Sequence, residues 1–110
     1  MRTGIWSSTS DVRDRLEAEF VRILGILDAR SDIDEVWRFG SMEDGEVHAT
    51  SDLDVLVVQR TDLDPVERGV ALRVELAARV PLDLFVVTPQ ELAEGGRFLD
   101  HVRSNGRRVR

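Results

Sequence analysis

The chain has 110 residues and a net charge of −6, from 21 acidic and 15 basic side chains, and it contains no cysteine. This length suits a single compact domain, and the missing cysteines exclude disulfides, thiolate metal sites and a cysteine nucleophile. All 15 basic side chains are arginine, which excludes a lysine-based phosphate grip or Schiff base, and the acidic balance argues against general nucleic-acid binding.

The first part of the chain is predicted to be a tail followed by a helix. Residues 1–10 carry Gly, Ser and Thr with little periodicity and lack the apolar segment of a signal peptide, so we expect a flexible tail. From Asp11 onward apolar residues recur at helical spacing, with Ser10 or Asp11 as the cap and Ser31-Asp32 as the stop. The stripe consists of Val12, Leu16, Phe20, Ile23 and Leu27.

Two strands separated by a polar segment are predicted next. Residues 33–39 (IDEVWRF) form a short β-prone run that ends at Gly40-Ser41. Residues 42–51 are polar and are expected to form a loop, or a short helix followed by a loop. Residues 53–58 (LDVLVV) are nearly continuously apolar, which is typical of a buried strand that is covered on both faces.

The remaining residues are predicted to alternate helix and strand. Asp64-Pro65-Val66-Glu67 and Thr88-Pro89-Gln90-Glu91 each combine a capping residue, a proline at the first helical position and a glutamate three residues after the cap. Between these two helix starts, Pro81 ends the first helix and residues 82–87 (LDLFVV) form a second buried strand. The first of these helices has one apolar stripe, made of Val66, Val70, Val74, Ala77 and Ala78.

This order of elements is typical of an α/β (α+β) domain with a small sheet covered by helices. Gly95-Gly96 is expected to break the last helical stretch, and residues 107–110 to add a short edge strand. No run approaches the roughly 20 apolar residues that span a bilayer. We therefore expect one domain over residues 11–110, in the cytoplasm and without a membrane partner.

Three aspartates open otherwise apolar strands. Asp52 and Asp54 flank Leu53, and because strand side chains alternate, both carboxylates point to the same face. Two carboxylates this close repel each other unless a cation lies between them, and Mg²⁺ prefers such oxygen ligands. If Asp83 lies on a neighbouring strand, it completes a three-carboxylate site that could hold two metal ions and support phosphoryl transfer.

Gly40-Ser41, just after the first strand, offers a matching phosphate site. Glycine lets the backbone approach a ligand closely, and the serine hydroxyl with nearby N–H groups can bind phosphate oxygens. A lone Asp-X-Asp or Gly-Ser is usually a turn, so the prediction depends on their joint arrangement. A phosphate site beside a metal cluster is what nucleotidyl transfer requires.

The order Gly40-Ser41, ten residues, Asp52-Leu53-Asp54 resembles the G-S-x10-D-x-D signature of the DNA polymerase β-like nucleotidyltransferase superfamily. The flanking segments VWRFGS, SDLDVLVV and PLDLFVVTPQEL are also similar, so the resemblance covers nearly the whole chain. The chain looks like the stand-alone branch of that superfamily, the minimal nucleotidyltransferase (MNT) domains. The resemblance implies the polymerase β-like palm fold, a small mixed β-sheet flanked by helices.

By this resemblance, Asp52, Asp54 and Asp83 bind magnesium, with two ions expected, and Asp83 is the general base for the attacking hydroxyl. Gly40 and Ser41 would hold the triphosphate of ATP. The resemblance further implies an MntA-like antitoxin that transfers AMP to a tyrosine hydroxyl of a HEPN-domain toxin, a ribonuclease, and thereby silences it.

Two alternatives stay open. One is a catalytically weak or inactive MNT-fold module that neutralises its partner by contact, and the other is transfer to a small molecule or RNA held by a separate subunit. The first is favoured by a departure from the family pattern, because Met42-Glu43-Asp44 stands where an arginine often follows Gly-Ser. Arg38 is a candidate to replace that arginine, the alternative being an ordinary surface residue.

Several conspicuous side chains are assigned no chemistry. His48 and His101 have no partner at ligand spacing and are expected on the surface. Trp37 is expected in the core. Trp6 is expected either to bind a partner or second copy, which would make a homo-oligomer, or to fold back onto the domain. The arginines near the C-terminus are interpreted as a solvated cluster: Arg103, Arg107, Arg108 and Arg110.

Overall fold

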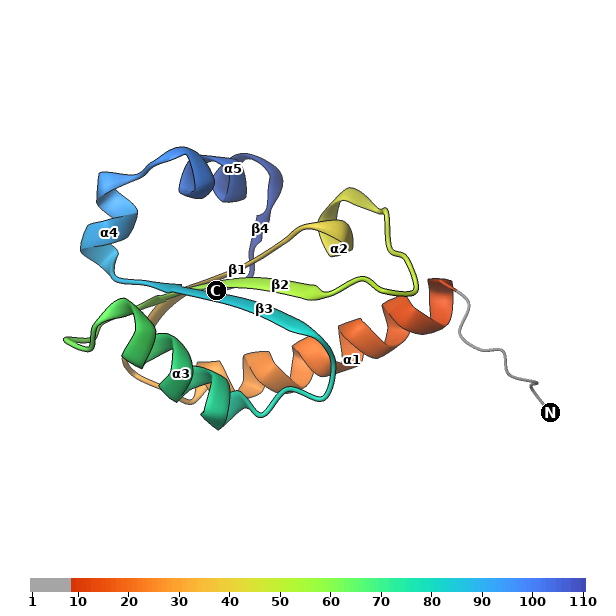
Figure 1. The fold of residues 1–110 in the computed structure, drawn as a ribbon, viewed down its shortest axis with the longest axis horizontal. Helices are drawn as coiled ribbons and strands as arrows, with labels where there is room; N and C mark the ends of the chain where they lie inside the picture. Colours follow the sequence, from red (N-terminus) through yellow and green to blue (C-terminus); the bar gives the residue numbers. More distant parts are fainter. Residues whose placement is uncertain (1–8) are drawn as a thin grey trace.

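The computed structural model describes residues 9–110, which form one mixed sheet with helices on both faces (Figure 1). The strands are β1 (Ile33–Phe39), β2 (Leu53–Gln59), β3 (Leu82–Val87) and β4 (Arg107–Arg108). The helices are α1 (Thr9–Asp28), α2 (Ser41–Asp44), α3 (Pro65–Leu76), α4 (Pro89–Glu94) and α5 (Arg97–Asn105).

The sheet has the strand order β3-β2-β1-β4. The β1–β2 and β1–β4 pairs are antiparallel, whereas β2 and β3 are parallel and joined through α3. Helices α1 and α3 cover one face of the sheet, and α4 and α5 lie over the other (Figure 1). This arrangement confirms the predicted fold class, a small mixed sheet flanked by helices.

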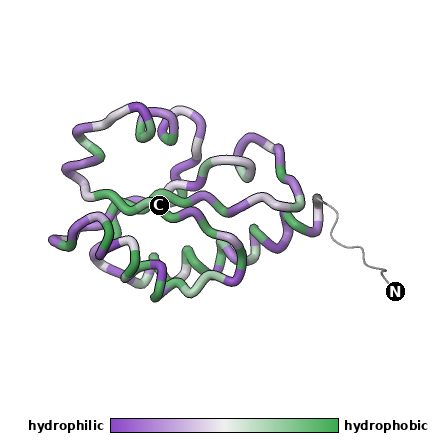
Figure 2. Tube along the Cα trace, in the orientation of Figure 1, coloured by the Kyte–Doolittle hydropathy of each residue, from purple (hydrophilic) through white to green (hydrophobic). Residues whose placement is uncertain are grey.

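The sheet separates two apolar clusters. Successive side chains of β2 point to opposite faces, so every second residue of this strand belongs to the same cluster. Leu53, Val55 and Val57 pack against α1 and α3. Leu56 and Val58 pack against α4 and α5 on the other face. Hydrophobic colouring therefore runs along much of the central strands (Figure 2). Residues 53–58 are covered on both faces, as their sequence predicts.

Both predicted capping boxes form. Asp64 Oδ1 accepts a hydrogen bond from the Glu67 backbone N–H at 2.9 Å, and Thr88 Oγ1 accepts one from the Glu91 N–H at 3.2 Å. In each case the glutamate side chain accepts in return from the backbone N–H of the capping residue. These caps fix the points at which the chain leaves β2 for α3 and β3 for α4.

Several elements begin or end close to their predicted positions. Helix α1 begins at Thr9, two residues before the predicted start, so Ser10 and Asp11 lie inside the helix. The division of the last helical stretch at Gly95-Gly96 is confirmed, and so is the C-terminal edge strand. Trp6 lies outside the described residues. No helix within residues 9–110 is long and apolar enough to cross a membrane.

The predicted apolar stripe of α3 does not form the buried face of that helix. Val66, Val70 and Val74 are exposed, and the buried row is made of Arg68, Leu72 and Leu76. Both rows have the same four-residue spacing, so periodicity alone does not distinguish them. The structure buries the row with the larger side chains, and Arg68 is accommodated because its guanidinium donates to the Val86 carbonyl and to Glu91.

The prediction that residues 82–87 form a fully buried strand is also wrong. β3 is the edge strand of the sheet, and only Leu84 among its residues is buried. Asp83 and Phe85 are exposed on the face that carries α4 and α5. An edge position explains how a carboxylate and a large aromatic ring can share a strand whose remaining residues are aliphatic.

Candidate active site

Asp54 and Asp83 stand side by side on the parallel strands β2 and β3, where they are register partners. Their neighbours Leu53 and Leu82 pack on the α1–α3 face, so both carboxylates project from the opposite face. The two carboxyl groups lie close enough to share a hydrogen bond when one of them is protonated. Asp52, one residue before β2, is half-buried and adds a further negative charge near Asp54. The structure thus brings two of the three predicted carboxylates into contact.

The crowding of negative charge is reflected in the pKa of Asp54. Burial, followed by repulsion and a hydrogen bond from Asp83, raises the pKa of Asp54 from its ordinary 3.8 to about 6. Asp52 and Asp44 add smaller repulsions. Burial and neighbouring negative charges destabilise the ionised form of Asp54. A bound cation would reduce that repulsion, so the carboxylate is a good site for one.

Asp54→Asn is expected to stabilise the ligand-free protein at pH 8 by about 1–2 kcal/mol, once solvent screening is allowed for. The unfolded chain loses this proton near pH 3.8, whereas the folded chain keeps it until about pH 6. The wild type therefore loses stability as pH rises through that window, and the asparagine variant does not. Urea denaturation from pH 4 to 8 measures the difference.

The matched control for this comparison is Asp62→Asn, which removes an exposed carboxylate from the loop before α3. Its stability should follow that of the wild type at every pH. A gap between Asp54→Asn and the wild type that does not change between pH 4 and 6 would show that Asp54 titrates normally.

The donor set suits a hard divalent cation, although it is not a complete cage. Among residues 9–110, no three Asp, Glu or His side chains are gathered closely enough to hold an ion by themselves. Mg²⁺ is usually held by one or two carboxylates, with water and substrate phosphates as its other ligands. The contacting pair Asp54 and Asp83 meets that requirement. A three-carboxylate site that includes Asp52 stays a prediction.

Gly40 is packed directly against Asp54. Its φ of 76° lies in the region that favours glycine, and it follows Phe39, the register partner of Asp54. A Cβ at this position would overlap Asp54 Oδ2 and lie 2.9 Å from Asp54 Cγ. Both the backbone conformation and the space therefore require glycine, and the predicted phosphate turn lies beside the predicted metal ligand.

Ser41 begins the short helix α2, which extends only to Asp44. The N–H groups of Glu43 and Asp44 both donate to the Gly40 carbonyl, at 2.9 and 3.1 Å. These bonds form the first turn of α2 directly after β1. The role of Ser41 in binding phosphate stays a prediction.

Arg38 is neither a surface residue nor a free phosphate ligand. It is 4% exposed, and its Nε and Nη1 donate to Glu43 Oε2 at 2.6 Å and Glu17 Oε1 at 2.7 Å. Its guanidinium also lies 5.0 Å from the centre of the Phe20 ring. Arg38 therefore neutralises Glu43 and ties α2 to α1, a role that its position before Gly-Ser does not reveal.

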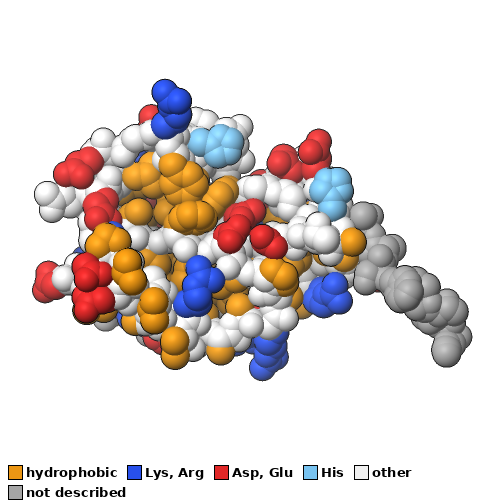
Figure 3. Space-filling view, in the orientation of Figure 1, with side chains coloured by type: hydrophobic (Ala, Val, Ile, Leu, Met, Phe, Trp, Pro, Cys, Tyr) orange, Lys and Arg blue, Asp and Glu red, His pale blue; other side chains and the backbone are white. Residues whose placement is uncertain are grey.

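An aromatic cluster, not anticipated from the sequence, lies beside the carboxylates. Phe39, Phe85 and Phe98 have ring centres 4.8 to 6.0 Å apart, with Phe39 buried and the other two each about two-fifths exposed. Figure 3 shows apolar side chains gathered next to acidic ones on this face of the molecule. The three rings come from β1, β3 and α5, so only the folded chain assembles them.

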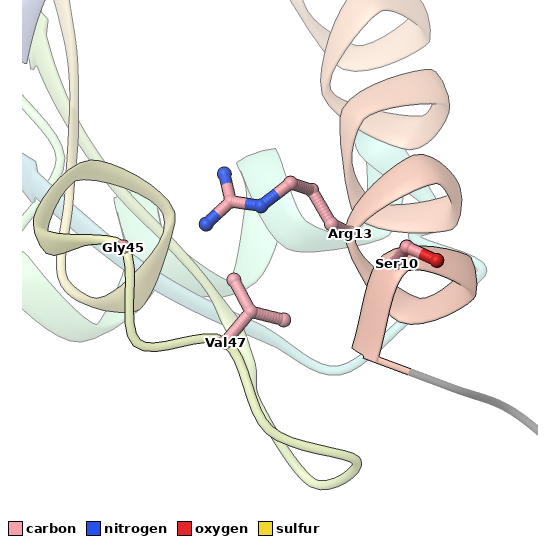
Figure 4. Close-up of a pocket in the computed structure, with 4 residues that line it drawn as sticks. All are labelled: Ser10, Arg13, Gly45 and Val47. Carbon is pink, nitrogen blue, oxygen red and sulfur yellow. The ribbon is translucent and has the colours of Figure 1, made fainter.

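A separate pocket lies between the first turns of α1 and the segment after α2 (Figure 4). It is lined by Ser10, Arg13, Gly45 and Val47, and Arg13 donates to the Met42 carbonyl at 3.5 Å. None of the candidate carboxylates lines it, so it is not part of the site described above.

The remaining sequence expectations for single residues are mostly met. His48 and His101 are exposed, as expected, and Trp37 is half-buried against the α4–α5 cluster. In the C-terminal cluster, Arg107 approaches Glu43 at 3.6 Å and Arg110 Nη1 donates to the Leu27 carbonyl at 2.9 Å. Arg110 is thus tied to the end of α1, whereas the side chain of Arg107 is 59% exposed, as expected of a solvated cluster.

Comparison with known proteins identifies the family of the chain. The family profile of the nucleotidyltransferase domain matches residues 21–79, slightly more than half of the chain. The matched segment contains Gly40, Ser41, Asp52 and Asp54, whereas Asp83 lies beyond it. A search of curated protein sequences finds no match.

Two solved structures share the fold. A candidate nucleotidyltransferase from Sulfolobus solfataricus is 20% identical, with a TM-score of 0.68 over 97% of this chain and 90% of that one. A toxin–antitoxin structure with AMP-PNP contains a chain that is 22% identical, with a TM-score of 0.52 over 86% of this chain and 72% of that one.

Proposed function

Because the chain belongs to the nucleotidyltransferase domain family, we propose that it transfers AMP from ATP to a hydroxyl group of a partner protein, as the antitoxin of a HEPN-type toxin. The observation that carries this proposal is the contact between Asp54 and Asp83 beside Gly40. Two adjacent carboxylates can hold a metal ion, and the glycine turn beside them can bind phosphate. Phosphoryl transfer needs both.

Asp54 and Asp83, with Asp52 nearby, are the residues that would hold magnesium. When bound, magnesium would neutralise charge on the transferred phosphate and on the leaving pyrophosphate. Burial and repulsion from Asp83 both raise the pKa of Asp54, and a bound cation would offset both effects. Gly40 would let the triphosphate approach the backbone at the start of α2, and Ser41 would offer its hydroxyl to a phosphate oxygen.

Asp83 is the residue best placed to receive the proton of the acceptor. It is exposed, on the edge strand of the sheet, so a hydroxyl of another protein can reach its carboxylate. Its contact with Asp54 keeps the acceptor next to the residue that would hold the metal. A general base must lie within hydrogen-bond reach of the proton that it removes, and this position allows it.

A protein acceptor is supported by the similarity to a toxin–antitoxin chain with AMP-PNP, an analogue of ATP. The net charge of −6 disfavours RNA as acceptor, since phosphate binding is driven by positive charge. The partner is expected to be a small helical protein encoded in the neighbouring reading frame. The acceptor would then be a side-chain hydroxyl, with tyrosine expected.

The proposal is tested by incubating the purified chain with ATP, magnesium and the product of the neighbouring reading frame. Mass spectrometry should find one AMP added to a hydroxyl of that partner, and none when magnesium is replaced by EDTA. A partner that remains unmodified under these conditions, although it forms a complex with the chain, would refute the transfer.

A contact-only module is the second candidate, and the surroundings of Glu43 favour it. Arg38 and Arg107 are both paired with Glu43, and Arg13 donates to the Met42 carbonyl. The arginines near Gly40-Ser41 therefore already have partners within the chain, which weakens their attraction for a triphosphate. Under this alternative, an Asp54→Asn chain would still protect cells from the toxin at normal expression.

A further inference from the structure

Resting on the proposed function, we infer that Phe85 and Phe98 form a stacking platform for the base of the nucleotide. The two rings lie 4.8 Å apart and are 40% and 41% exposed, although both are large and apolar. They rest on the buried ring of Phe39, whose centre lies 6.0 Å from that of Phe85 and 5.7 Å from that of Phe98. The platform therefore has a buried base and an exposed surface. The two exposed rings are tilted at 49° to each other, so a base would stack on the face of one and pack against the other.

The platform is continuous with the carboxylates. Phe39 is the register partner of Asp54, and Phe85 follows Asp83 by two residues on the same face of β3. A nucleotide whose phosphates lie at Asp54 and Gly40 would therefore have the aromatic rings on the adjoining part of the same face. Figure 3 shows this neighbourhood of apolar and acidic surface.

The charges near Gly40 explain why such a platform would be needed. Arg38 and Arg107 are both engaged by Glu43, so they add little attraction for a triphosphate. The carboxylates themselves repel phosphate until a cation is bound. Stacking of the base on aromatic rings would add affinity that depends on neither the arginines nor the cation.

A protein surface fits the platform less well than a base does. The other large apolar side chains exposed within residues 9–110 are Val21 on α1, three valines on α3, and Leu63 in the loop before α3. On the α4–α5 face, the large apolar side chains that are exposed within the described residues are Phe85 and Phe98. A stable protein interface covers about 800 Å² on each partner, which is far more than two half-exposed rings.

The test compares the binding of Mg-ATP with that of magnesium tripolyphosphate, which has the same phosphates and no base. Phe98→Ala should weaken Mg-ATP binding by about 5-fold to 100-fold and leave tripolyphosphate binding unchanged. Phe98→Trp keeps an aromatic surface and should retain ATP affinity. Val70→Ala, at a more exposed apolar residue on α3, serves as the control and should change neither.

Each other outcome overturns the inference in a recognisable way. If Phe98→Ala lowers the binding of both ligands equally, the ring supports the phosphate site and does not stack a base. If ATP binding is unchanged but AMP transfer to the partner falls, the rings hold the acceptor. If the wild type binds tripolyphosphate and ATP equally well, no platform exists. Failure of the wild type to bind either ligand would instead refute the proposed function, and the inference with it.

Discussion

Asp54→Asn should lower AMP transfer by about 10³-fold or more, while the protein remains folded. Asp54 lies next to Asp83 on one side and Gly40 on the other, so it is central to the site. Asparagine keeps the shape of the side chain but removes the charge that would hold magnesium. The rate of label transfer from α-labelled ATP to the partner protein measures the effect.

The control for this substitution is Asp100→Asn, which removes an exposed carboxylate from α5 on the same side of the sheet. Its transfer rate should stay within a few-fold of the wild-type rate. Circular dichroism of both variants separates loss of chemistry from loss of fold. Substantial transfer by a folded Asp54→Asn protein would show that this carboxylate is not a metal ligand.

Arg38→Ala should lower the free energy of unfolding by about 2–4 kcal/mol. Glu43 is well buried beside the guanidinium, and without it only the more distant Arg107, at 3.6 Å, would balance the Glu43 charge. The contact with the Phe20 ring and the bond to Glu17 would also be lost. Urea denaturation at pH 7 gives the change directly.

Arg60→Ala is the matched control, because Arg60 pairs with Asp34 at 2.8 Å on the exposed surface. Its substitution should cost less than about 1 kcal/mol. Arg38→Lys should recover only part of the stability, since one ammonium cannot reach two carboxylates in the geometry of a planar guanidinium. If Arg38→Ala and Arg60→Ala cost the same, Arg38 is an ordinary surface ion pair.

Features encoded by neighbouring residues could be predicted from the sequence. The capping boxes at Asp64 and Thr88 depend on residues within one helical turn, and both form. The continuous apolar run of residues 53–58 indicates a central strand because only a strand covered on both faces can bury it. The contact of Asp54 with Asp83 is predicted only on the condition that their strands are neighbours, a condition that the parallel β2–β3 pair meets.

Features that depend on contacts between distant residues could not be predicted. Glu17 lies 21 residues before Arg38, so nothing local announces that this arginine is buried. The rings of Phe39, Phe85 and Phe98 come from three separate elements. The α3 helix offers two apolar rows of equal spacing, and only the packing against the sheet selects Leu72 and Leu76.

The central claim is that Asp54 and Asp83 form a magnesium–nucleotide site, and thermal unfolding with and without Mg-ATP tests it most directly. The wild type should gain about 2.7 kcal/mol, a rise of several degrees in Tm, when free Mg-ATP is 100 times its Kd. Asp54→Asn should show no such rise, and ATP with EDTA should leave both proteins unchanged. An equal rise in the two proteins, or none in the wild type, would contradict the account.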